Sequence, residues 1–206
     1  MQVHPLEDLN VRYRITGKRA YFPTAYDSSS MTQMTIPFAP PSVLLGLVER
    51  VYWKPEFKTH IQKIRICSPI KYAEVNNRLP FNKVISKTIA SYEKHQSIKS
   101  KIQILLDVEY VVDVLYENIS PSITSADTHL GIIKDVCKTK NYHSTPALGC
   151  DSFVANVSLA TGFETVEDIN IDVENLLHHY HYDSPDTSTP VLFNAHVRHG
   201  VLDTVI

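Results

Sequence analysis

The residues of this chain that could most readily do chemistry are its histidines, cysteines and lysines. Residues 178–182 form a histidine- and tyrosine-rich run, in which His179 and His181 would share one face of a strand. Paired imidazoles can bind zinc, but no carboxylate or cysteine stands nearby at clear ligand spacing. We therefore interpret the run as part of a strand and not as a metal site.

The three cysteines carry little of the chemistry that cysteines usually perform. Cys67, Cys137 and Cys150 form no CxxC pair, and Cys137, His143 and Cys150 match no closed zinc motif. The chain has only six glycines, with neither a Walker-type loop nor a GxGxxG. The sequence thus predicts no metal and no cofactor, and a sparse, odd cysteine set suits a reducing cytoplasm.

Lysines are concentrated in one segment. Residues 76–101 carry six cations and one carboxylate, residues 1–75 have a net charge of +4, and residues 102–206 a net charge of −11. This asymmetry permits a local basic face for phosphates, although two solvated faces that happen to differ in sign would look the same. We favour RNA contact by residues 76–101, where Tyr92 and His95 could also stack on unpaired bases.

The elements that would position these residues follow from hydrophobic periodicity. Residues 9–15 alternate as a strand with Arg12 and Arg14 on one face. Ser42 could cap a helix whose apolar residues recur at helical spacing until Lys54-Pro55 ends it. Residues 61–72 predict a strand broken near Pro69, and residues 102–117 a long strand with one buried face.

The second half predicts a further helix and strands. Ser125 or Asp127 could cap the helix, and residues 150–159 resume strand character. Residues 161–190 are acidic and irregular, and residues 191–195 and 201–206 flank a turn at His199-Gly200 as a closing hairpin.

This order of elements predicts an α+β fold, namely a ferredoxin-like (RRM-like) βαββαβ core with a basic insertion and a C-terminal β-hairpin extension. The core would span residues 1–160, with the insertion at about 76–101, and the extension residues 161–206. No apolar stretch approaches the roughly 18 residues that would span a bilayer, and no secretory signal is evident, so we expect a cytoplasmic protein without membrane contact.

Three stretches resemble a known family. The run from Pro40 to Phe57 (PPSVLLGLVERVYWKPEF) is similar to the first helix of the Cas-five family of CRISPR surveillance-complex subunits, and its Tyr-Trp-Lys-Pro end resembles the subtype I-C branch. Leu148-Gly149-Cys150 with Phe153-Val154 resembles a second family region, and residues 175–202 resemble its closing Tyr-rich strand and hairpin. The stretches occur in the family's order, and the shortness of the chain suggests a divergent or minimal class 1 system.

In the subtype I-C branch the resemblance implies a metal-independent endoribonuclease that cuts the precursor transcript in its repeat and stays on the 5′ handle. Carried over, its catalytic tyrosine is Tyr52 and its histidine is His129. Thr128 stands where the family has a lysine. Cleavage through a 2′,3′-cyclic phosphate needs a base, an acid and a cation beside the phosphorane, and Thr128 supplies no charge.

The leading hypothesis is therefore a subunit that binds and caps the 5′ handle of the crRNA in a Cascade-like complex. Its partners would be the backbone and large or effector subunits, and target nucleic acid through the complex. The alternative is the endoribonuclease itself, and a third hypothesis is a generic ferredoxin-like RNA-binding or ligand-sensing domain. The expected RNA-binding residues are Arg12, Arg14, Lys18, Arg19, Arg50, Lys54, Lys83, Lys87, Lys94, Lys99 and Lys101.

Overall fold

The computed structural model describes residues 5–23, 32–78, 99–121, 123–184 and 187–204 of the 206-residue chain. Within these ranges the elements are, in order, β1 (Glu7–Ala20), β2 (Thr32–Gln33), α1 (Pro41–Val51), β3 (Lys58–Ile66), β4 (Lys71–Arg78), β5 (Lys99–Ile119), α2 (Ala126–Thr139), β6 (Asn156–Leu159), β7 (Ile171–Ser184), β8 (Thr187–Val197) and β9 (Val201–Asp203). Neither described helix is long and apolar enough to cross a membrane.

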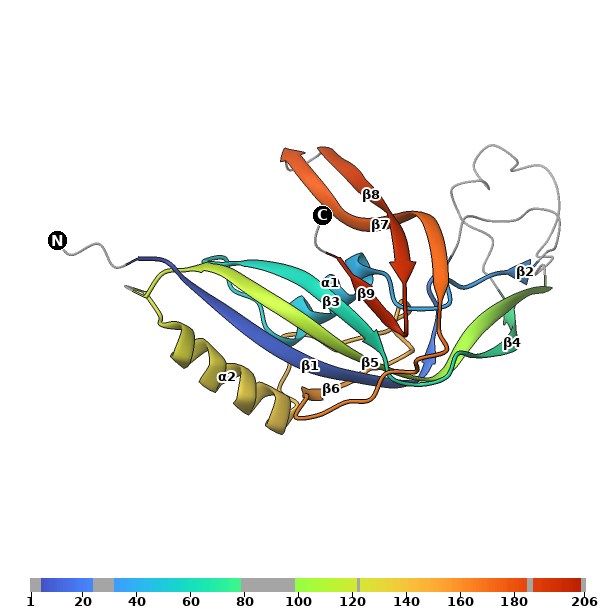
Figure 1. The fold of residues 1–206 in the computed structure, drawn as a ribbon, viewed down its shortest axis with the longest axis horizontal. Helices are drawn as coiled ribbons and strands as arrows, with labels where there is room; N and C mark the ends of the chain where they lie inside the picture. Colours follow the sequence, from blue (N-terminus) through green and yellow to red (C-terminus); the bar gives the residue numbers. More distant parts are fainter. Residues whose placement is uncertain (1–4, 24–31, 79–98, 122, 185–186, 205–206) are drawn as a thin grey trace, which may run out of the picture.

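The long strand β5 organises the main sheet. The strand order is β6-β1-β5-β3-β9 with every neighbouring pair antiparallel, while β4 and β2 also pair with β5. In Figure 1, α2 lies on one side of this sheet and the two-stranded ribbon β7–β8 stands on the other side of the view. The predicted α+β class with an antiparallel sheet is confirmed.

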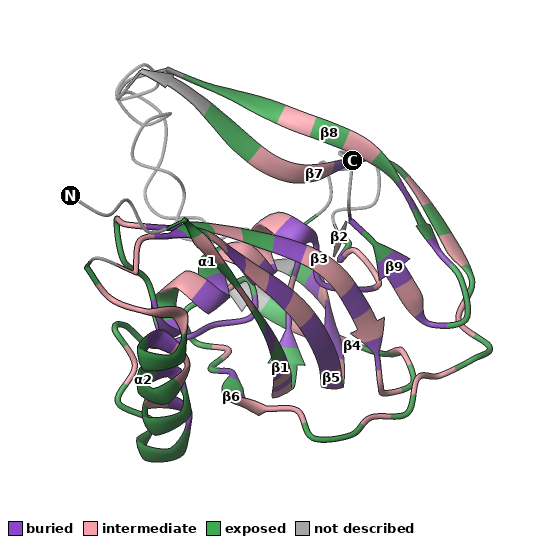
Figure 2. Cartoon of the chain, turned by 60° about the vertical axis from the view of Figure 1, so that its left-hand side comes forward, coloured by how far each residue is buried: buried purple, intermediate pink, exposed green. Residues whose placement is uncertain are grey.

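A single apolar core fills the space between the sheet and the helices. It takes Tyr13 and Ile15 from β1, every second residue of β5 from Tyr110 to Tyr116, and Leu44, Leu47, Val48 and Val51 from α1. Figure 2 shows α2 with buried residues toward the sheet and exposed residues on its outer side. The hydroxyls of Tyr13 and Tyr116 lie 2.7 Å apart inside this core and hydrogen-bond to each other, so neither buried hydroxyl is left without a partner.

The opposite face of the sheet is charged, because side chains alternate along a strand. Arg12 Nε donates to Asp113 Oδ1 at 2.6 Å, and Arg65 Nη1 lies 2.8 Å from Asp113 Oδ2. Both guanidiniums also lie over the ring of Phe163, at 5.1 and 4.6 Å. Burial disfavours the charged form of Asp113, but the two arginines outweigh burial and lower its pKa.

Several predicted boundaries hold and others shift. The break near Pro69 separates β3 from β4, and Ser125, not Asp127, caps α2. Ser42 does not cap α1: the N-cap is Pro40, whose carbonyl accepts from the N–H groups of Val43 and Leu44, and no side chain caps this end. Of the basic insertion, residues 79–98 lie outside the described part of the chain.

The C-terminal region differs most from the prediction. Residues 161–170 are irregular as predicted, but the remainder of the segment 161–190 is not, since β7 occupies 171–184 and β8 begins at 187. The turn at His199-Gly200 is present, with φ of 50° and 71°, and Arg198 and Val201 exchange backbone hydrogen bonds across it. Beyond this one bridge, β8 pairs with β7 and β9 pairs with β3, so the two strands do not extend the expected hairpin. Register shifts between Val173 and Leu176 and between Leu177 and His179 break the period-two pattern that would have predicted β7.

The strand predicted at 150–159 is shorter and covers only β6. The preceding residues instead dock on the end of β1: Tyr21 N donates to the carbonyl of Leu148, and Leu148 N to that of Phe153. Gly149 has φ of +83°, and a Cβ there would overlap the carbonyl of Tyr21. The Leu-Gly pair therefore has a structural role, because only glycine allows this close approach.

Candidate active site

Tyr52 is placed by the end of α1. The helix stops at Val51, and Tyr52 takes extended backbone angles (φ −153°, ψ 123°) three residues before Pro55. Because successive side chains of extended chain point to opposite sides, Tyr52 turns inward and is 5% exposed while Trp53 turns outward and is 46% exposed.

His129 is placed by the start of α2. Ser125 Oγ accepts from the N–H of Thr128, and the carboxylate of Glu7 accepts from the N–H of Ala126 at 3.0 Å. These bonds satisfy free donors of the first turn and fix its orientation on β1. As a result His129 points into the core, with 1% of its side chain exposed, while Thr128 faces outward.

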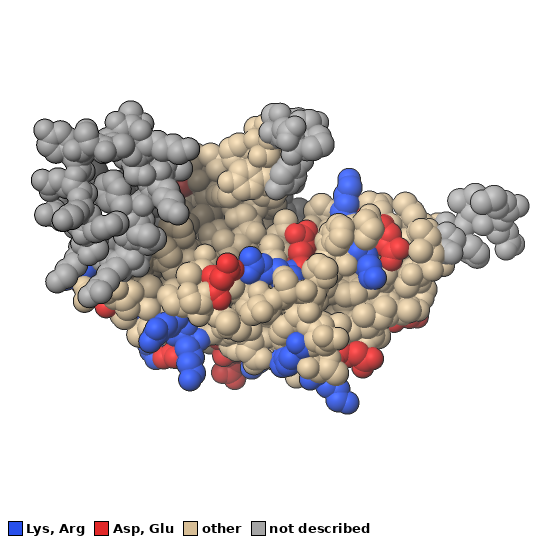
Figure 3. Space-filling view, turned by 180° about the vertical axis from the view of Figure 1, so that it is seen from behind, with Lys and Arg blue, Asp and Glu red and all other residues tan. Residues whose placement is uncertain are grey.

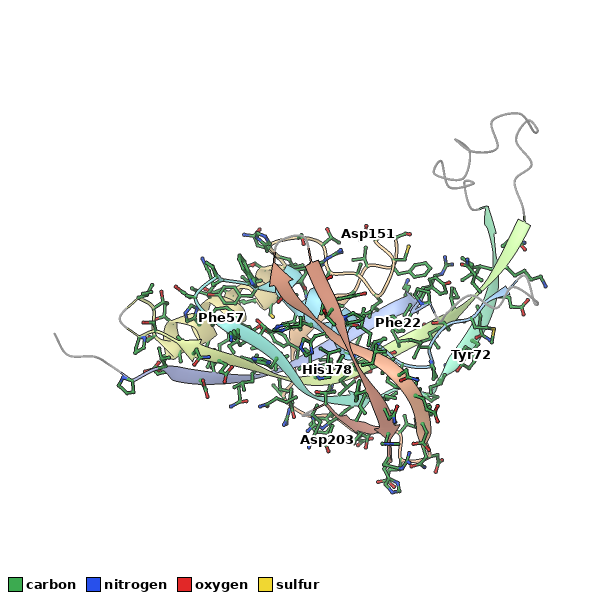
Figure 4. All side chains as sticks on the ribbon, turned by 90° about the horizontal axis from the view of Figure 1, so that it is seen from above. Phe22, Phe57, Tyr72, Asp151, His178 and Asp203 are labelled. Atoms are coloured by element: carbon green, nitrogen blue, oxygen red, sulfur yellow. The ribbon has the colours of Figure 1, made fainter. Side chains whose placement is uncertain are left out.

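The structure brings the two predicted catalytic residues together. Tyr52 Oη lies 2.7 Å from His129 Nδ1, and His129 Nε2 lies 3.2 Å from Glu56 Oε1 without the angles of a hydrogen bond. The carboxylate favours a proton on Nε2, so Nδ1 is the acceptor and Tyr52 donates to it. The rings of Phe57 and Tyr116 pack edge-on around the pair. Figure 4 shows Phe57 beside α2, far from Tyr72.

Both groups of the pair are neutral near neutral pH. Burial lowers the pKa of His129; Glu56 acts against this shift and Lys54 adds to it. Burial, followed by the charge of Glu56, raises the pKa of Tyr52. A neutral imidazole that accepts from a phenol can take up a proton through that phenol. Both rings are buried, and Glu56 and Phe57, from the segment after α1, lie against the pair.

Thr128 supplies no cation to this site, and Lys54 is the nearby lysine that could replace it. Lys140 Nζ donates to the carbonyl of Val157 at 2.6 Å, at the other end of α2, about 18 Å from Thr128 at 1.5 Å per residue. Lys134 and Lys138 are exposed on the same helix. Lys54, by contrast, is exposed and its charge already acts on the pKa of His129. Sequence reasoning assigned Lys54 to RNA binding only and missed Glu56, although both belong to the Tyr-Trp-Lys-Pro-Glu-Phe run.

The other predicted RNA-binding cations fall into three groups. Arg12, Arg14, Arg50 and Lys101 are each paired with a carboxylate, namely Asp113, Glu109, Asp151 and Glu74. Within the described ranges, Lys18, Arg19 and Lys54 have no carboxylate at ion-pair distance. Lys83, Lys87 and Lys94 lie outside the described residues, and for Lys99 only the backbone in β5 is described.

No metal centre accompanies this site in the described part of the chain, where no three His, Cys, Asp or Glu side chains gather as ligands. In the histidine-rich run, His178 Nε2 donates to the carbonyl of Thr204 at 2.8 Å, and its Nδ1 lies 2.7 Å from His179 Nδ1. These contacts tie β7 to the end of the chain, as expected of a structural strand.

Comparison with known proteins adds independent information. No protein-family model matches the sequence. The CRISPR pre-crRNA endoribonuclease Cas5d of Thermus thermophilus is 25% identical over 170 residues, which cover 81% of this chain and 71% of that protein. The Cas5d of Mannheimia succiniciproducens is 22% identical over 184 residues, covering 79% and 81%.

Two solved structures show the same fold. A CRISPR-associated protein superposes with a TM-score of 0.71 at 17% identity, and a functionally uncharacterized protein of Streptococcus mutans with a TM-score of 0.69 at 18% identity. Each comparison covers 97% of this chain and 94% of the other. Two Cas5d relatives that match over about four-fifths of the chain, and three motifs in the family's order, support the assignment of this chain to the Cas5 family of CRISPR-associated proteins.

Proposed function

We propose that this chain is a subunit of a class 1 CRISPR RNA-guided complex in which it binds and caps the 5′ handle of the crRNA. The observation that carries the proposal is the likeness, over 81% and 79% of the chain, to two proteins named for acting on pre-crRNA. A protein that recognises a repeat at its cleavage point has to hold the RNA beside that point, and this segment becomes the handle.

The unpaired cations support RNA binding at the two ends of β1. Lys54 lies at the candidate active site, and Lys18 and Arg19 lie near the other end of this strand, about 30 Å away at 3.3 Å per residue. Figure 3 shows Lys and Arg interspersed with Asp and Glu over one face and no single basic patch. An extended single strand that touches separate cations fits this pattern better than a duplex lying on one basic surface.

The fold supports the same proposal at a finer level. We infer that β1, α1, β3, β5, α2 and β6 form a ferredoxin-like core within residues 1–160, because the sheet order β6-β1-β5-β3 is that of a split βαβ pair. Residues 161–206 would be an extension that docks on the backbone and large subunits. The complex would work in the cytoplasm and reach target nucleic acid through its guide.

A second candidate function, cleavage of the precursor, is favoured by the 2.7 Å contact between Tyr52 and His129. The 2′-oxygen would attack the phosphorus as the bond to the 5′-oxygen breaks, leaving a 2′,3′-cyclic phosphate. The 2′-hydroxyl proton would pass to Tyr52 Oη as the Tyr52 proton moves to His129 Nδ1, and the leaving 5′-oxygen would take up one proton as His129 returns its own through Tyr52. Lys54 would stabilise the charge on the phosphorane. Residues 53–57 would have to open for RNA to reach the pair.

The experiment that tests both functions incubates the purified chain, in EDTA, with its labelled cognate repeat RNA and records retention and cleavage. Handle capping predicts retention that survives in His129→Gln. Cleavage predicts a cut at the base of the stem that is lost, by roughly 10²-fold or more, in His129→Gln and persists in His196→Gln, a surface histidine on β8.

Retention without a cut supports handle capping alone. A cut that His129→Gln leaves intact excludes the proposed catalytic pair. If neither the chain nor its co-expressed complex retains the repeat, the proposed function is wrong.

A further inference from the structure

A shallow cavity of about 240 Å³, widely open to solvent, lies between the outer side of α1 and the chain that follows α2. Its lining residues are Gly46, Glu49, Arg50, Trp53, His143 and Ser144. Gly46, Glu49 and Arg50 stand at positions i, i+3 and i+4 of α1 and therefore lie on one stripe of this helix, and Trp53 follows the end of the helix. This volume is below the range of about 300–1,000 Å³ for drug-sized ligands and suits a single flat ring system.

The walls of this cavity are fixed by contacts that do not involve a ligand. Ser144 N donates to the carbonyl of Arg50 at 2.9 Å. Arg50 Nη1 donates in turn to the carbonyl of Thr145 at 3.2 Å and to Asp151 Oδ1 at 3.0 Å. Residues 144–151 are thus pinned to α1, which keeps the space between the two segments open in a defined shape.

The lining offers a stacking surface and an acceptor. Trp53, 46% exposed, is the only tryptophan of the chain and is among its most exposed large apolar residues. The Glu49 carboxylate is half-buried, and among the described residues no hydrogen bond or ion pair engages it. Burial raises the pKa of Glu49, because the charged carboxylate is partly removed from water. A ligand that donates N–H groups to Glu49 would replace the hydrogen bonds to water that its carboxylate loses on burial.

We infer that this cavity binds one unpaired guanine of a single-stranded RNA, stacked on Trp53 with its Watson–Crick edge on Glu49. The inference rests on the proposed function, because it assumes that RNA reaches this end of the molecule. Unpaired bases in RNA are commonly read by stacking on aromatic rings and by hydrogen bonds to that edge. Trp53 directly follows Tyr52 and turns to the opposite side of the extended chain, so the bound base would lie across residues 52–53 from the pair of Tyr52 and His129.

Guanine is the base whose chemistry fits the lining best. Its N1–H and N2 amino groups are adjacent donors and can both reach one carboxylate, whereas the Watson–Crick edges of adenine and cytosine present one amino donor beside an acceptor nitrogen. The edge of uracil presents one imino donor between two carbonyls, which a carboxylate repels. The cavity would therefore select a guanine over the other three bases, a specificity that binding of the RNA backbone alone does not require.

The single tryptophan makes the test direct. The full chain is titrated with two uridine-rich RNA heptamers, one with a central guanine and one with a central adenine, and Trp53 fluorescence is followed to saturation. The guanine heptamer should quench at a lower concentration, and Glu49→Gln should reduce its advantage by roughly 5- to 100-fold. Equal dissociation constants for the two heptamers, or an advantage that survives Glu49→Gln, would overturn the inference.

A blocking variant separates binding from folding. A Cβ at Gly46 has nothing within 4 Å, so Gly46→Leu should fill the cavity and leave the core intact. Gly131 in α2 has the same open surroundings, and Gly131→Leu is the matched control. Affinity for a labelled guanine heptamer, measured by anisotropy, should fall roughly 5- to 150-fold in Gly46→Leu and Trp53→Ala, and should not change in Gly131→Leu or Tyr180→Ala. Unchanged affinity in Gly46→Leu, with the fold intact by circular dichroism, would rule out this cavity.

The two proposals fail in different ways. Retention of the cognate repeat without any change of Trp53 fluorescence overturns the guanine site and leaves handle binding intact. Guanine-dependent quenching by heptamers without retention of the repeat supports the site and removes the proposed function.

Discussion

His129 lies between two opposite charges. The Glu56 carboxylate, 3.2 Å from Nε2, favours the protonated ring, and the Lys54 ammonium disfavours it; burial outweighs Glu56, so the pKa is lowered. A ring that stays neutral at neutral pH can accept a proton from Tyr52, whereas a protonated ring cannot. The state of this site therefore depends on two residues of the loop that follows α1.

Two substitutions should move the pKa of His129 in opposite directions. Glu56→Gln removes the charge that raises it and should lower the pKa further, and Lys54→Gln should raise it. Titration of the His129 ring protons by NMR measures both. Shifts of the same sign would mean that the loop does not hold these charges near the ring.

The same lowered pKa links stability to pH. The unfolded chain binds the His129 proton more readily than the folded chain, so the contribution to stability is fully present above about pH 6.5. This contribution is lost as the pH falls through the folded pKa of His129. The loss amounts to about 1.4 kcal/mol for each unit by which the unfolded and folded pKa values differ. Urea unfolding at pH 7 and pH 5 should show a smaller loss in His129→Gln than in the wild type.

At the scale of elements, the candidate site depends on how residues 146–155 dock on β1. Leu148 is fully buried and packs against Gly17, while Gly149 sits against the carbonyl of Tyr21 with a positive φ. Arg50 holds the same segment to α1 through Thr145 and Asp151. This segment thus connects the sheet to the helix that ends in Tyr52.

Glycine-to-alanine substitutions should therefore have opposite effects at two positions. Gly149→Ala should lower the free energy of unfolding by about 1–3 kcal/mol, since a Cβ there meets backbone in a left-handed conformation. Gly131→Ala, inside α2 with open space around its Cβ, should raise it by roughly 0.5–1 kcal/mol. Chemical denaturation measures both, and a neutral Gly149→Ala would contradict the described docking.

At the scale of the whole molecule, ion pairing with carboxylates decides which lysines and arginines are available to bind RNA phosphates. Arg12 and Arg65 share Asp113 and lie over Phe163, so this face of the sheet is neutralised from within. Lys18, Arg19 and Lys54 keep their charge available, since no described carboxylate lies at ion-pair distance from them. A net charge of −2 is therefore compatible with RNA binding at a few positions.

Salt dependence of RNA retention should separate these two kinds of cation. For single strands each phosphate contact adds about 0.7 to the slope of log affinity against log salt. Lys54→Gln should reduce the slope by about that amount, whereas Arg12→Gln should leave it unchanged and lower stability by less than about 1 kcal/mol. A reduced slope in Arg12→Gln would show that RNA displaces the pairing with Asp113.

The sequence by itself determined the elements whose pattern is local. The alternation along residues 102–117, the apolar stripe before Tyr52 and the cap at Ser125 each depend on neighbours a few residues away, and each was predicted. The family also followed from sequence, because its motifs are contiguous. β7 was missed because bulges interrupt its period, so its hairpin pairing with β8 was missed with it. The pairing of β9 with β3 joins residues more than 130 positions apart, which leaves no local signal.

Only the tertiary structure decided what surrounds the candidate site. Tyr52 and His129 are 77 positions apart, and their contact exists because α1 ends and α2 begins over the same end of the sheet. Their burial, the position of Glu56 and the charge of Lys54 follow from that packing. The cavity beside Trp53 likewise needs the chain after α2 to fold back onto α1. The hydrophobic periodicity of a sequence indicates which face of a helix or strand is buried, but it does not indicate which other element packs against that face.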